Sequence, residues 1–276
     1  MKILVTGANG YIGQGIVSEL YRMGHEVVAT DLSINNIKED VTKITANLFD
    51  VSDPYDFFDK PDCVLHLAWR DGFKHNSINH INDLPKHYDF LKKVAESGIK
   101  KISVMGSMHE IGFFEGSINE NTPANPQSLY GISKNALRHA FELLSKEFCF
   151  DYQWLRGYYI VGNSKYGCSI FSKITEAVEK GKKEFPFTMG QNQYDFLDYD
   201  IFCRQVACTT TQNEINGIIN CCSGKPMKLA DRVEKFITEN GYDITLQYGA
   251  FPDRPYDSKA VWGDAKKINL IMEMYK

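Results

Sequence analysis

The sequence has no long hydrophobic run, no surplus of basic residues and no cysteine pattern typical of a metal site. No apolar stretch approaches the ~20 residues of a membrane-spanning helix, and the apolar segment after Met1 is too short for a signal-peptide core. Lysine and arginine number 31 against 35 acidic residues, which gives a net charge of −4. We therefore expect a cytoplasmic protein with no membrane anchor and no nucleic-acid partner.

The cysteines contain neither a Cys-x-x-Cys pair nor a Cys/His spacing that holds a metal ion. We expect no metal site and interpret the cysteines as reduced, mostly buried apolar side chains. They stand at positions 63, 149, 168, 203, 208, 221 and 222.

Short apolar runs alternate with helical patterns in the first 160 residues. The runs are Ile3–Val5, Glu26–Ala29, Cys63–Leu67, Ile102–Met105 and Tyr152–Leu155. The helical patterns cover Ile12–Met23, Leu84–Ser97 and Tyr130–Phe148. Runs that are apolar on both faces and separated by helices predict an α/β protein with a doubly wound parallel sheet covered on both sides, a Rossmann fold.

The turn after the first strand is rich in glycine. It reads Thr-Gly-Ala-Asn-Gly-Tyr-Ile-Gly from Thr6 to Gly13 and opens the first helix, where a dinucleotide pyrophosphate would meet free N–H groups. A purely structural turn is the alternative. We expect the cofactor to contact Gly7, Asn9, Gly10, Tyr11, Ile12 and Gly13.

Asp31 ends the second strand, about 18 residues beyond Gly13. A carboxylate there accepts hydrogen bonds from the adenosine ribose and repels a 2′-phosphate, so NAD is favoured over NADP. The alternative is that Asp31 only caps the following turn.

The alternation of strands and helices ends after Gly162, except for a predicted strand at Ile215–Cys221. We therefore predict an NAD-binding Rossmann domain over residues 1–160 and a smaller α/β substrate-binding lobe over residues 161–276. Residues 198–222 are expected to return to the Rossmann side.

Tyr130 and Lys134 lie one helical turn apart on the same face of a predicted helix. A free tyrosine has a pKa of about 10, and a neighbouring ammonium group together with an oxidised nicotinamide ring favours the phenolate. Such a phenol exchanges a proton with an alcohol while hydride moves to or from the cofactor. An isolated Tyr-x-x-x-Lys pattern more often marks two solvated helix residues, so the position of the pattern in the chain decides between a catalytic pair and two surface residues.

With these motifs in place, the chain resembles the extended short-chain dehydrogenase/reductases, in particular the NAD-dependent nucleotide-sugar epimerase/dehydratase family. The resemblance covers nearly the whole length. Further matching segments follow in the family's order: His66-Leu67-Ala68, Gly106-Ser107, Pro126-Gln127-Ser128, Leu155-Arg156, Val161-Gly162, Asp195-Phe196-Leu197, Asn220–Gly224 and Arg254–Asp257.

The resemblance implies roles for individual residues. Ser107 would complete a Ser-Tyr-Lys triad and bond the reacting oxygen, and Arg254 would grip the nucleotide diphosphate. The implied cofactor contacts are Asn47 and Leu48 beside adenine, then Leu67, Ala68, Asn82, Tyr130 and Lys134. The resemblance also implies a homodimer formed through the Tyr-Lys helix and the helix before the fifth strand.

The departures from the family pattern narrow the reaction. Met108-His109 replace the Asp-Glu pair of sugar 4,6-dehydratases, which disfavours dehydration. His109 is either a residue that titrates near pH 7 at the substrate or a structural histidine. Tyr194 and Tyr159 replace a substrate-contacting arginine and asparagine, which argues against ordinary UDP-glucose or UDP-galactose. The chain is also short in the substrate lobe, so a smaller sugar pocket is expected.

We therefore predict NAD-dependent hydride transfer at C4 of a nucleotide-activated hexose, by a 4-epimerase or a 4-keto-sugar reductase. The predicted substrate contacts are Ser107, His109, Tyr159, Tyr194 and Arg254. Two alternatives remain open: a non-catalytic NAD-binding regulator of the same fold, and a reductase of a carbonyl compound without a nucleotide.

Overall fold

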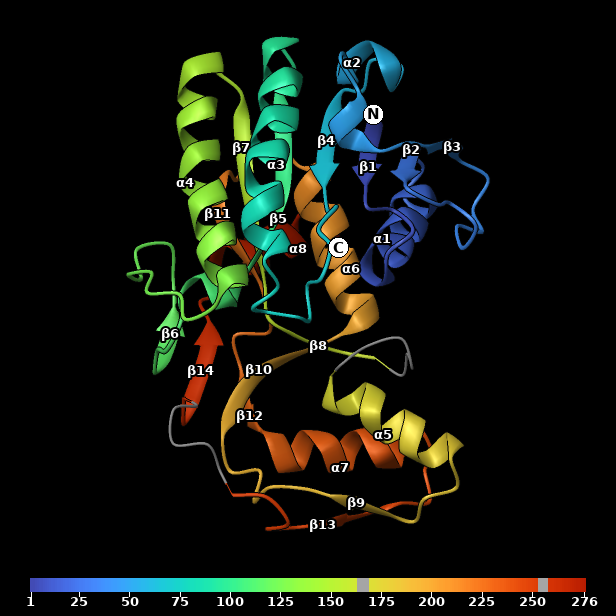
Figure 1. The fold of residues 1–276 in the computed structure, drawn as a ribbon, viewed down its shortest axis with the longest axis vertical. Helices are drawn as coiled ribbons and strands as arrows, with labels where there is room; N and C mark the ends of the chain where they lie inside the picture. Colours follow the sequence, from blue (N-terminus) through green and yellow to red (C-terminus); the bar gives the residue numbers. More distant parts are fainter. Residues whose placement is uncertain (163–168, 253–257) are drawn as a thin grey trace.

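The computed structural model describes residues 1–162, 169–252 and 258–276. Its largest sheet has seven parallel strands in the order β11-β7-β5-β4-β1-β2-β3 (Figure 1). They are β1 (Lys2–Thr6), β2 (Glu26–Asp31), β3 (Thr42–Thr45), β4 (Cys63–His66), β5 (Lys101–Ser107), β7 (Asp151–Gly157) and β11 (Gly217–Cys221). The strand order reverses direction between β1 and β4, and ligands of such sheets bind at the carboxyl ends of the strands beside this point.

Helices cover both faces of this sheet (Figure 1). Consecutive β1 residues alternate between two cores, since Ile3 and Val5 pack with one helical layer and Leu4 with the other. One layer contains α1 (Tyr11–Arg22), α6 (Tyr199–Thr211) and α8 (Lys266–Glu273). The other contains α2 (Pro54–Phe57), α3 (Asn79–Glu96) and α4 (Leu129–Phe148). The predicted doubly wound parallel fold is confirmed.

The remaining elements form the smaller lobe below the main sheet (Figure 1). Its mixed sheet contains β6 (Gly116–Ile118), β8 (Tyr159–Val161), β10 (Gln193–Asp198), β12 (Pro226–Lys228) and β14 (Ala260–Gly263). A separate pair is formed by β9 (Glu184–Pro186) and β13 (Thr245–Gln247), beside α5 (Ile170–Glu179) and α7 (Leu229–Glu239). Phe171, Val233 and Phe236 belong to the core of this lobe.

Several segments late in the chain lie on the main sheet rather than in the lobe. Strand β11 pairs with β7, and α6 packs on α1. Helix α8 also packs on α6 and β11, although it falls in the range predicted for the lobe. The division at residue 160 stays a prediction.

Two observations bear on the protein's environment. Among the described residues, no helix is both long and apolar enough to span a bilayer. All six described cysteines are unpaired, and five of them are buried, as predicted. The exposed one is Cys149. Cys168 lies outside the described residues.

Candidate active site

The glycine-rich turn follows β1 directly and leads into α1. Gly7 adopts a φ of +67°, and a Cβ atom there would lie 2.6 Å from the backbone N of Ala68. A Cβ atom on Gly13 would lie 2.3 Å from the carbonyl oxygen of Gly7. Both positions therefore require glycine for the close approach of turn, helix and strand. Gly10 is the N-cap residue of α1, and no side chain in the described parts of the chain caps this helix. The N–H groups of Tyr11, Ile12 and the rest of the first turn therefore point outward.

Asp31 fixes the loop beside this turn. Its Oδ2 accepts a hydrogen bond of 3.0 Å from the N–H of Asn9, and its Oδ1 accepts one of 2.7 Å from the N–H of Leu32. The side-chain oxygen of Asn9 in turn accepts a hydrogen bond of 2.9 Å from the N–H of Asn36. The carboxylate thus organises the turn, and it stands at the end of β2 where the sequence predicted a ribose contact.

The other predicted cofactor residues lie in different surroundings. Asn47 caps the short 3-10 helix η1 (Leu48–Asp50) by accepting from the N–H of Phe49, while Leu48 and Leu67 are buried. Ala68 donates its N–H to the hydroxyl of Thr6. Asn82 is exposed on α3, and its contact with the cofactor stays a prediction.

Tyr130, Ser107 and Lys134 come together at the carboxyl end of β5. Ser107 is the last residue of β5, and Tyr130 lies in the first turn of α4, which Ser128 caps. Burial raises the pKa of Tyr130 to about 12, although a hydrogen bond with Ser107 acts in the lowering direction. Burial lowers the pKa of Lys134 to about 7. That Lys134 lowers the pKa of Tyr130 is thus not shown here and stays a prediction.

A buried glutamate missed by the sequence reasoning lies under Ser107. Glu110 ends the 3-10 helix η2 (Met108–Glu110), and its Oε1 accepts hydrogen bonds of 2.8 Å from the N–H of Ser107 and 2.7 Å from the indole N–H of Trp154. Its Oε2 lies 3.3 Å from Nε of Arg138 and 3.5 Å from Nη2 of Arg156. The Ser107-x-x-Glu110 spacing, which is typical of a capping box, could have indicated from the sequence that Glu110 contacts Ser107.

Aromatic side chains surround the Tyr130 phenol ring. His75 stacks on it with ring centroids 5.5 Å apart, and the carbonyl of His75 accepts the N–H of Tyr130. The rings of His80, His109 and Trp69 lie 5.3, 6.0 and 6.2 Å from it. These residues enclose one side of the phenol.

Two histidines of this cluster, His109 and His75, have lowered pKa values. Burial lowers the pKa of His109 to about 4, and the neighbouring His75 acts in the same direction. The pKa of His75 is lowered as well, again chiefly by burial. The alternative in which His109 titrates near pH 7 is therefore not supported. Within the described residues, no three His, Cys, Asp or Glu side chains are arranged to hold a metal ion.

The predicted substrate residues of the second lobe lie in its sheet. Tyr159 in β8 and Tyr194 in β10 have ring centroids 4.6 Å apart, because the two strands run side by side. Phe196 extends this aromatic surface, 5.7 Å from the Tyr159 ring. Arg254 lies outside the described residues.

A tyrosine at the start of α6 contacts the first turns of α1, beside the glycine-rich turn. The hydroxyl of Tyr199 accepts a hydrogen bond of 3.1 Å from the N–H of Gly15 and donates one of 2.5 Å to the carbonyl of Tyr11. It therefore stands between two groups that would otherwise bond to each other within α1. A Cβ atom on Gly15 would lie 2.5 Å from this hydroxyl. Sequence reasoning missed both residues, because their meeting depends on the packing of distant helices.

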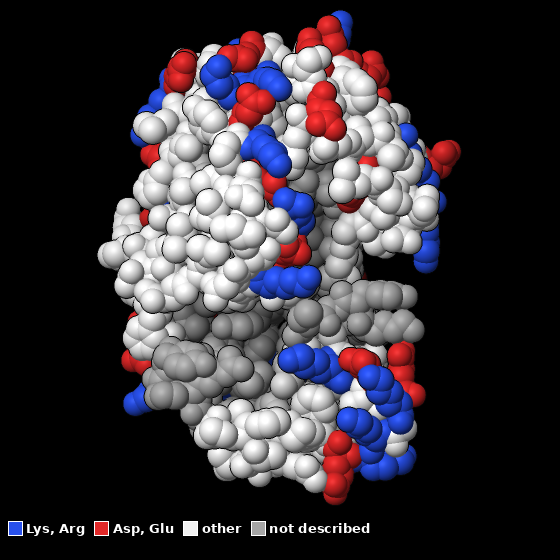
Figure 2. All heavy atoms as spheres, in the orientation of Figure 1, with Lys and Arg blue, Asp and Glu red and all other residues white. Residues whose placement is uncertain are grey.

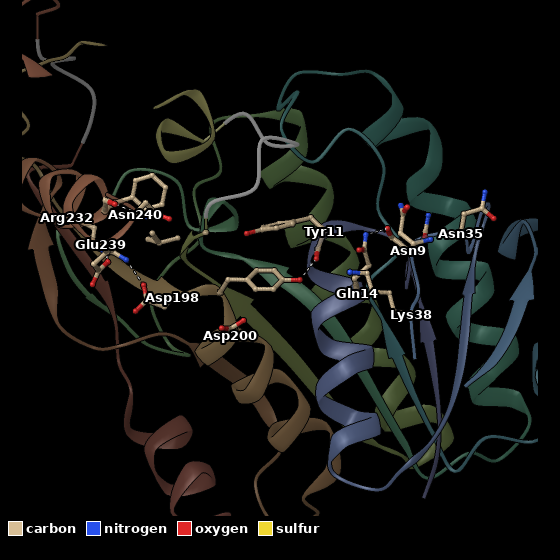
Figure 3. A pocket seen from close by; sticks show the side chains of 15 residues that line it. Asn9, Tyr11, Gln14, Asn35, Lys38, Asp198, Asp200, Arg232, Glu239 and Asn240 are labelled. Carbon is tan, nitrogen blue, oxygen red and sulfur yellow. Dashed lines mark hydrogen bonds and ion pairs between the residues drawn. The ribbon is translucent and has the colours of Figure 1, made fainter. Parts of the chain in front are cut away.

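A cavity of about 990 Å³ opens between the start of α1 and helix α7 (Figure 3). Asn9, Tyr11 and Gln14 line one side, and Arg232 and Glu239 line the other. Figure 3 shows these two groups of side chains facing each other across the opening. The lining includes the cofactor turn but not the triad, so the cavity lies beside the turn rather than at the Tyr130 hydroxyl.

Comparison with known proteins decides the family. The model of the NAD-dependent epimerase/dehydratase family matches residues 3–222. This chain belongs to that family. It is therefore an NAD-dependent enzyme, as the sequence predicted.

Individual members of the family sharpen this result. The chain is 44% identical over 269 residues to the dTDP-6-deoxy-L-talose 4-dehydrogenase (NAD⁺) of Aggregatibacter actinomycetemcomitans, covering 95% of this chain and 99% of that protein. It is 24% identical to a putative UDP-glucose 4-epimerase of Methanocaldococcus jannaschii, covering 98% and 92%. These relatives confirm the predicted class of NAD-dependent hydride transfer on nucleotide sugars.

Solved structures of family members share the fold. The UDP-glucose 4-epimerase of Thermotoga maritima, crystallised with UDP-glucose, matches with a TM-score of 0.82 at 22% identity, over 98% of this chain and 92% of that one. The dTDP-glucose 4,6-dehydratase of Bacillus anthracis, crystallised with NAD, also gives a TM-score of 0.82, at 18% identity over 99% and 90%.

Proposed function

We propose that this protein catalyses the reversible NAD-dependent oxidation of the C4 hydroxyl of a dTDP-activated 6-deoxyhexose. The observation that carries the proposal is the 44% identity, over 95% of this chain and 99% of the relative, to a protein named for that reaction. The arrangement of Ser107, Tyr130 and Lys134 supports it, because these side chains meet at the carboxyl end of β5.

The residues of the glycine-rich turn fit a dinucleotide. Gly7 and Gly13 allow the turn to pack closely against the strand and the helix, and the first turn of α1, which has no side-chain cap, offers N–H groups that suit a pyrophosphate. Asp31 stands at the end of β2, where its carboxylate would hold the adenosine ribose and disfavour a 2′-phosphate. When bound, NAD⁺ supplies the acceptor for the hydride that leaves C4.

Tyr130 is the proposed acid and base. In the direction of oxidation its phenolate takes the proton of the C4 hydroxyl as the hydride leaves carbon, so the products are a 4-keto sugar, NADH and the tyrosine phenol. The Ser107 hydroxyl oxygen accepts the N–H of His109 at 3.3 Å, so its own proton can be donated to Tyr130 or, with substrate bound, to the reacting oxygen. Lys134 stabilises the phenolate and holds the nicotinamide ribose.

The second lobe is proposed to select the sugar nucleotide. Tyr194 and Tyr159 present aromatic rings where the family pattern has an arginine and an asparagine, respectively. We propose that Tyr159, Tyr194 and His109 contact the sugar and that Arg254 holds the diphosphate.

The reaction and the sugar are tested together with purified protein. dTDP-6-deoxy-L-talose, dTDP-glucose, UDP-glucose and UDP-galactose are each incubated with NAD⁺, and NADH is followed by absorbance. The proposal predicts stoichiometric NADH formation with the dTDP-6-deoxyhexose and little with the UDP-sugars. Epimerised sugar without net NADH would indicate a 4-epimerase, and no reaction with any sugar would contradict the proposal.

We also propose a homodimer formed through α3 and α4. Ile81, Ile132 and Leu143 on these helices are exposed to 37%, 43% and 66%. Figure 2 shows a broad area with few charges on the side where α4 and β6 lie. Leu143→Glu should shift sedimentation from dimer to monomer, whereas Leu270→Glu on α8 should not; an unshifted dimer in the first variant would contradict this interface.

The cytoplasm is the proposed location. Unpaired cysteines suit a reducing compartment, and five of the described ones are buried free thiols. Fractionation of cells that express the tagged protein should place it with cytoplasmic markers; recovery with membranes would contradict the proposal.

A further inference from the structure

Lys134 is buried without a carboxylate partner. Only 2% of the residue is exposed, and across residues 1–162, 169–252 and 258–276 no acidic side chain lies within ion-pair distance of its ammonium group. Nζ donates a hydrogen bond of 2.8 Å to the carbonyl of Met105 and lies 3.9 Å from the centroid of the Trp69 ring. The indole face is thus in direct contact with a cation that has left water.

The Trp69 ring is fixed by its neighbours. Its N–H donates a hydrogen bond of 3.0 Å to Nδ1 of His80, whose Nε2 lies 3.0 Å from the carbonyl of Lys74. Because a carbonyl only accepts, Nε2 of His80 carries the proton and Nδ1 is left as the acceptor for the indole. His87 stacks on Trp69 with centroids 4.4 Å apart and an interplanar angle of 13°.

We propose that Trp69 is a positioning residue for the reaction: its ring face holds the Lys134 side chain as an ammonium ion at the place where it supports the Tyr130 phenolate. The inference rests on the proposed role of the Tyr130–Lys134 pair. No motif of the sequence pointed to Trp69, which follows the matching segment that ends at Ala68.

The groups around Lys134 show why such support matters. Burial lowers the pKa of Lys134, and Glu110 in η2 opposes this at longer range. His66 in β4 and His87 in α3 also face the ammonium group, and burial lowers the pKa of each, so neither adds a charge near pH 7. The ring face therefore adds a favourable interaction for the cation that none of these neighbours replaces at contact distance.

The ring also biases the position of one shared proton. Phenolate with ammonium and phenol with amine contain the same number of protons, so their ratio is set by the surroundings rather than by pH. A cation over an aromatic face favours the first form. By the usual strength of a desolvated cation–π contact, loss of the ring should reduce that form roughly 3- to 30-fold.

The test compares Trp69→Leu with Trp69→Phe, which keeps an aromatic face but loses the indole N–H. Trp262→Leu in β14 is the matched control for loss of an indole. We expect Trp69→Leu to lower kcat roughly 3- to 30-fold with KM nearly unchanged. Trp69→Phe should recover most of the activity. A loss in Trp69→Phe as large as in Trp69→Leu would assign the effect to the indole hydrogen bond and overturn the proposal.

A second readout requires no substrate. In protein with ¹³C-labelled lysine side chains, the titration midpoint of Lys134 is followed by NMR and assigned by its absence in Lys134→Met. Trp69→Leu should lower this midpoint by roughly 0.5 to 1.5 pH units, and Trp262→Leu should leave it in place. If no sugar is turned over, the proposed function fails while this titration still decides the role of Trp69.

If Trp69→Leu does not fold, the same titration is measured in protein that contains a fluorinated tryptophan. Incorporation at all three tryptophan positions keeps the shape of the ring and weakens its negative face. The Lys134 midpoint should then fall in the otherwise unchanged protein but not in the Trp69→Phe background. An unchanged midpoint in the fluorinated protein would overturn the proposal.

Discussion

Replacing Glu110 tests the buried network that supports Ser107. The Glu110 side chain is 0% exposed, and the two arginines near it, Arg138 and Arg156, are 11% and 1% exposed. Glu110→Gln keeps an oxygen for the N–H groups of Ser107 and Trp154 but removes the only charge that the two guanidinium groups face within 4 Å in the described parts of the chain. Breaking a buried pair by removing one partner costs about 3–5 kcal/mol.

We therefore expect Glu110→Gln to lower the free energy of unfolding by about 3 kcal/mol. Glu110→Ala should lower it by about 5 kcal/mol, because two hydrogen bonds of about 1 kcal/mol each are also lost. Urea denaturation followed by circular dichroism measures both values, and the exposed Glu147→Gln in α4 serves as the control. A change below about 1 kcal/mol in Glu110→Gln would refute this reasoning about the network.

Three further predictions concern the glycine-rich turn, His109 and the link between Tyr199 and α1. Gly13→Ala should weaken NAD binding at least about tenfold in calorimetry, since its Cβ atom would lie 2.3 Å from a backbone oxygen, whereas Gly72→Ala, with no atom within 4 Å, should not. The pKa of His109 is lowered to about 4 in the folded protein. The stabilisation that comes from keeping His109 neutral is therefore complete above about pH 6.5 and is lost as the pH falls towards 4. His109→Asn should flatten this part of the urea-stability profile, and an equally steep profile would contradict the shift. Tyr199→Phe removes a hydroxyl with two hydrogen bonds and should cost about 1–2 kcal/mol of stability and weaken NAD binding; unchanged affinity would contradict the link.

The sequence allowed the fold and the centre of the site to be predicted because both depend on local patterns. All six predicted strands and all three predicted helices are present. Helix α3 begins at Asn79, five residues before the predicted start at Leu84, and continues through Pro85. A proline seven positions into a helix normally argues against the preceding turn, and only tertiary packing keeps it.

The surroundings of the site could not be predicted in the same way. Trp69 and His75 lie on the irregular segment between β4 and α3, which has no periodicity to indicate direction. Arg138 and Arg156 meet Glu110 from α4 and β7, and only the assembled sheet brings these elements together. Such contacts depend on long-range packing rather than on sequence spacing.

The proposed chemistry is tested most directly by following the hydrogen at C4. A dTDP-6-deoxyhexose labelled with deuterium at C4 is incubated with NAD⁺ and with either the wild-type protein or Tyr130→Phe. We predict deuterated NADH from the wild type, and a kcat reduced roughly 10²- to 10⁴-fold in Tyr130→Phe while NAD affinity is retained. Unlabelled NADH, or turnover by Tyr130→Phe within about tenfold of the wild type, would contradict hydride transfer from C4 with Tyr130 as the acid and base.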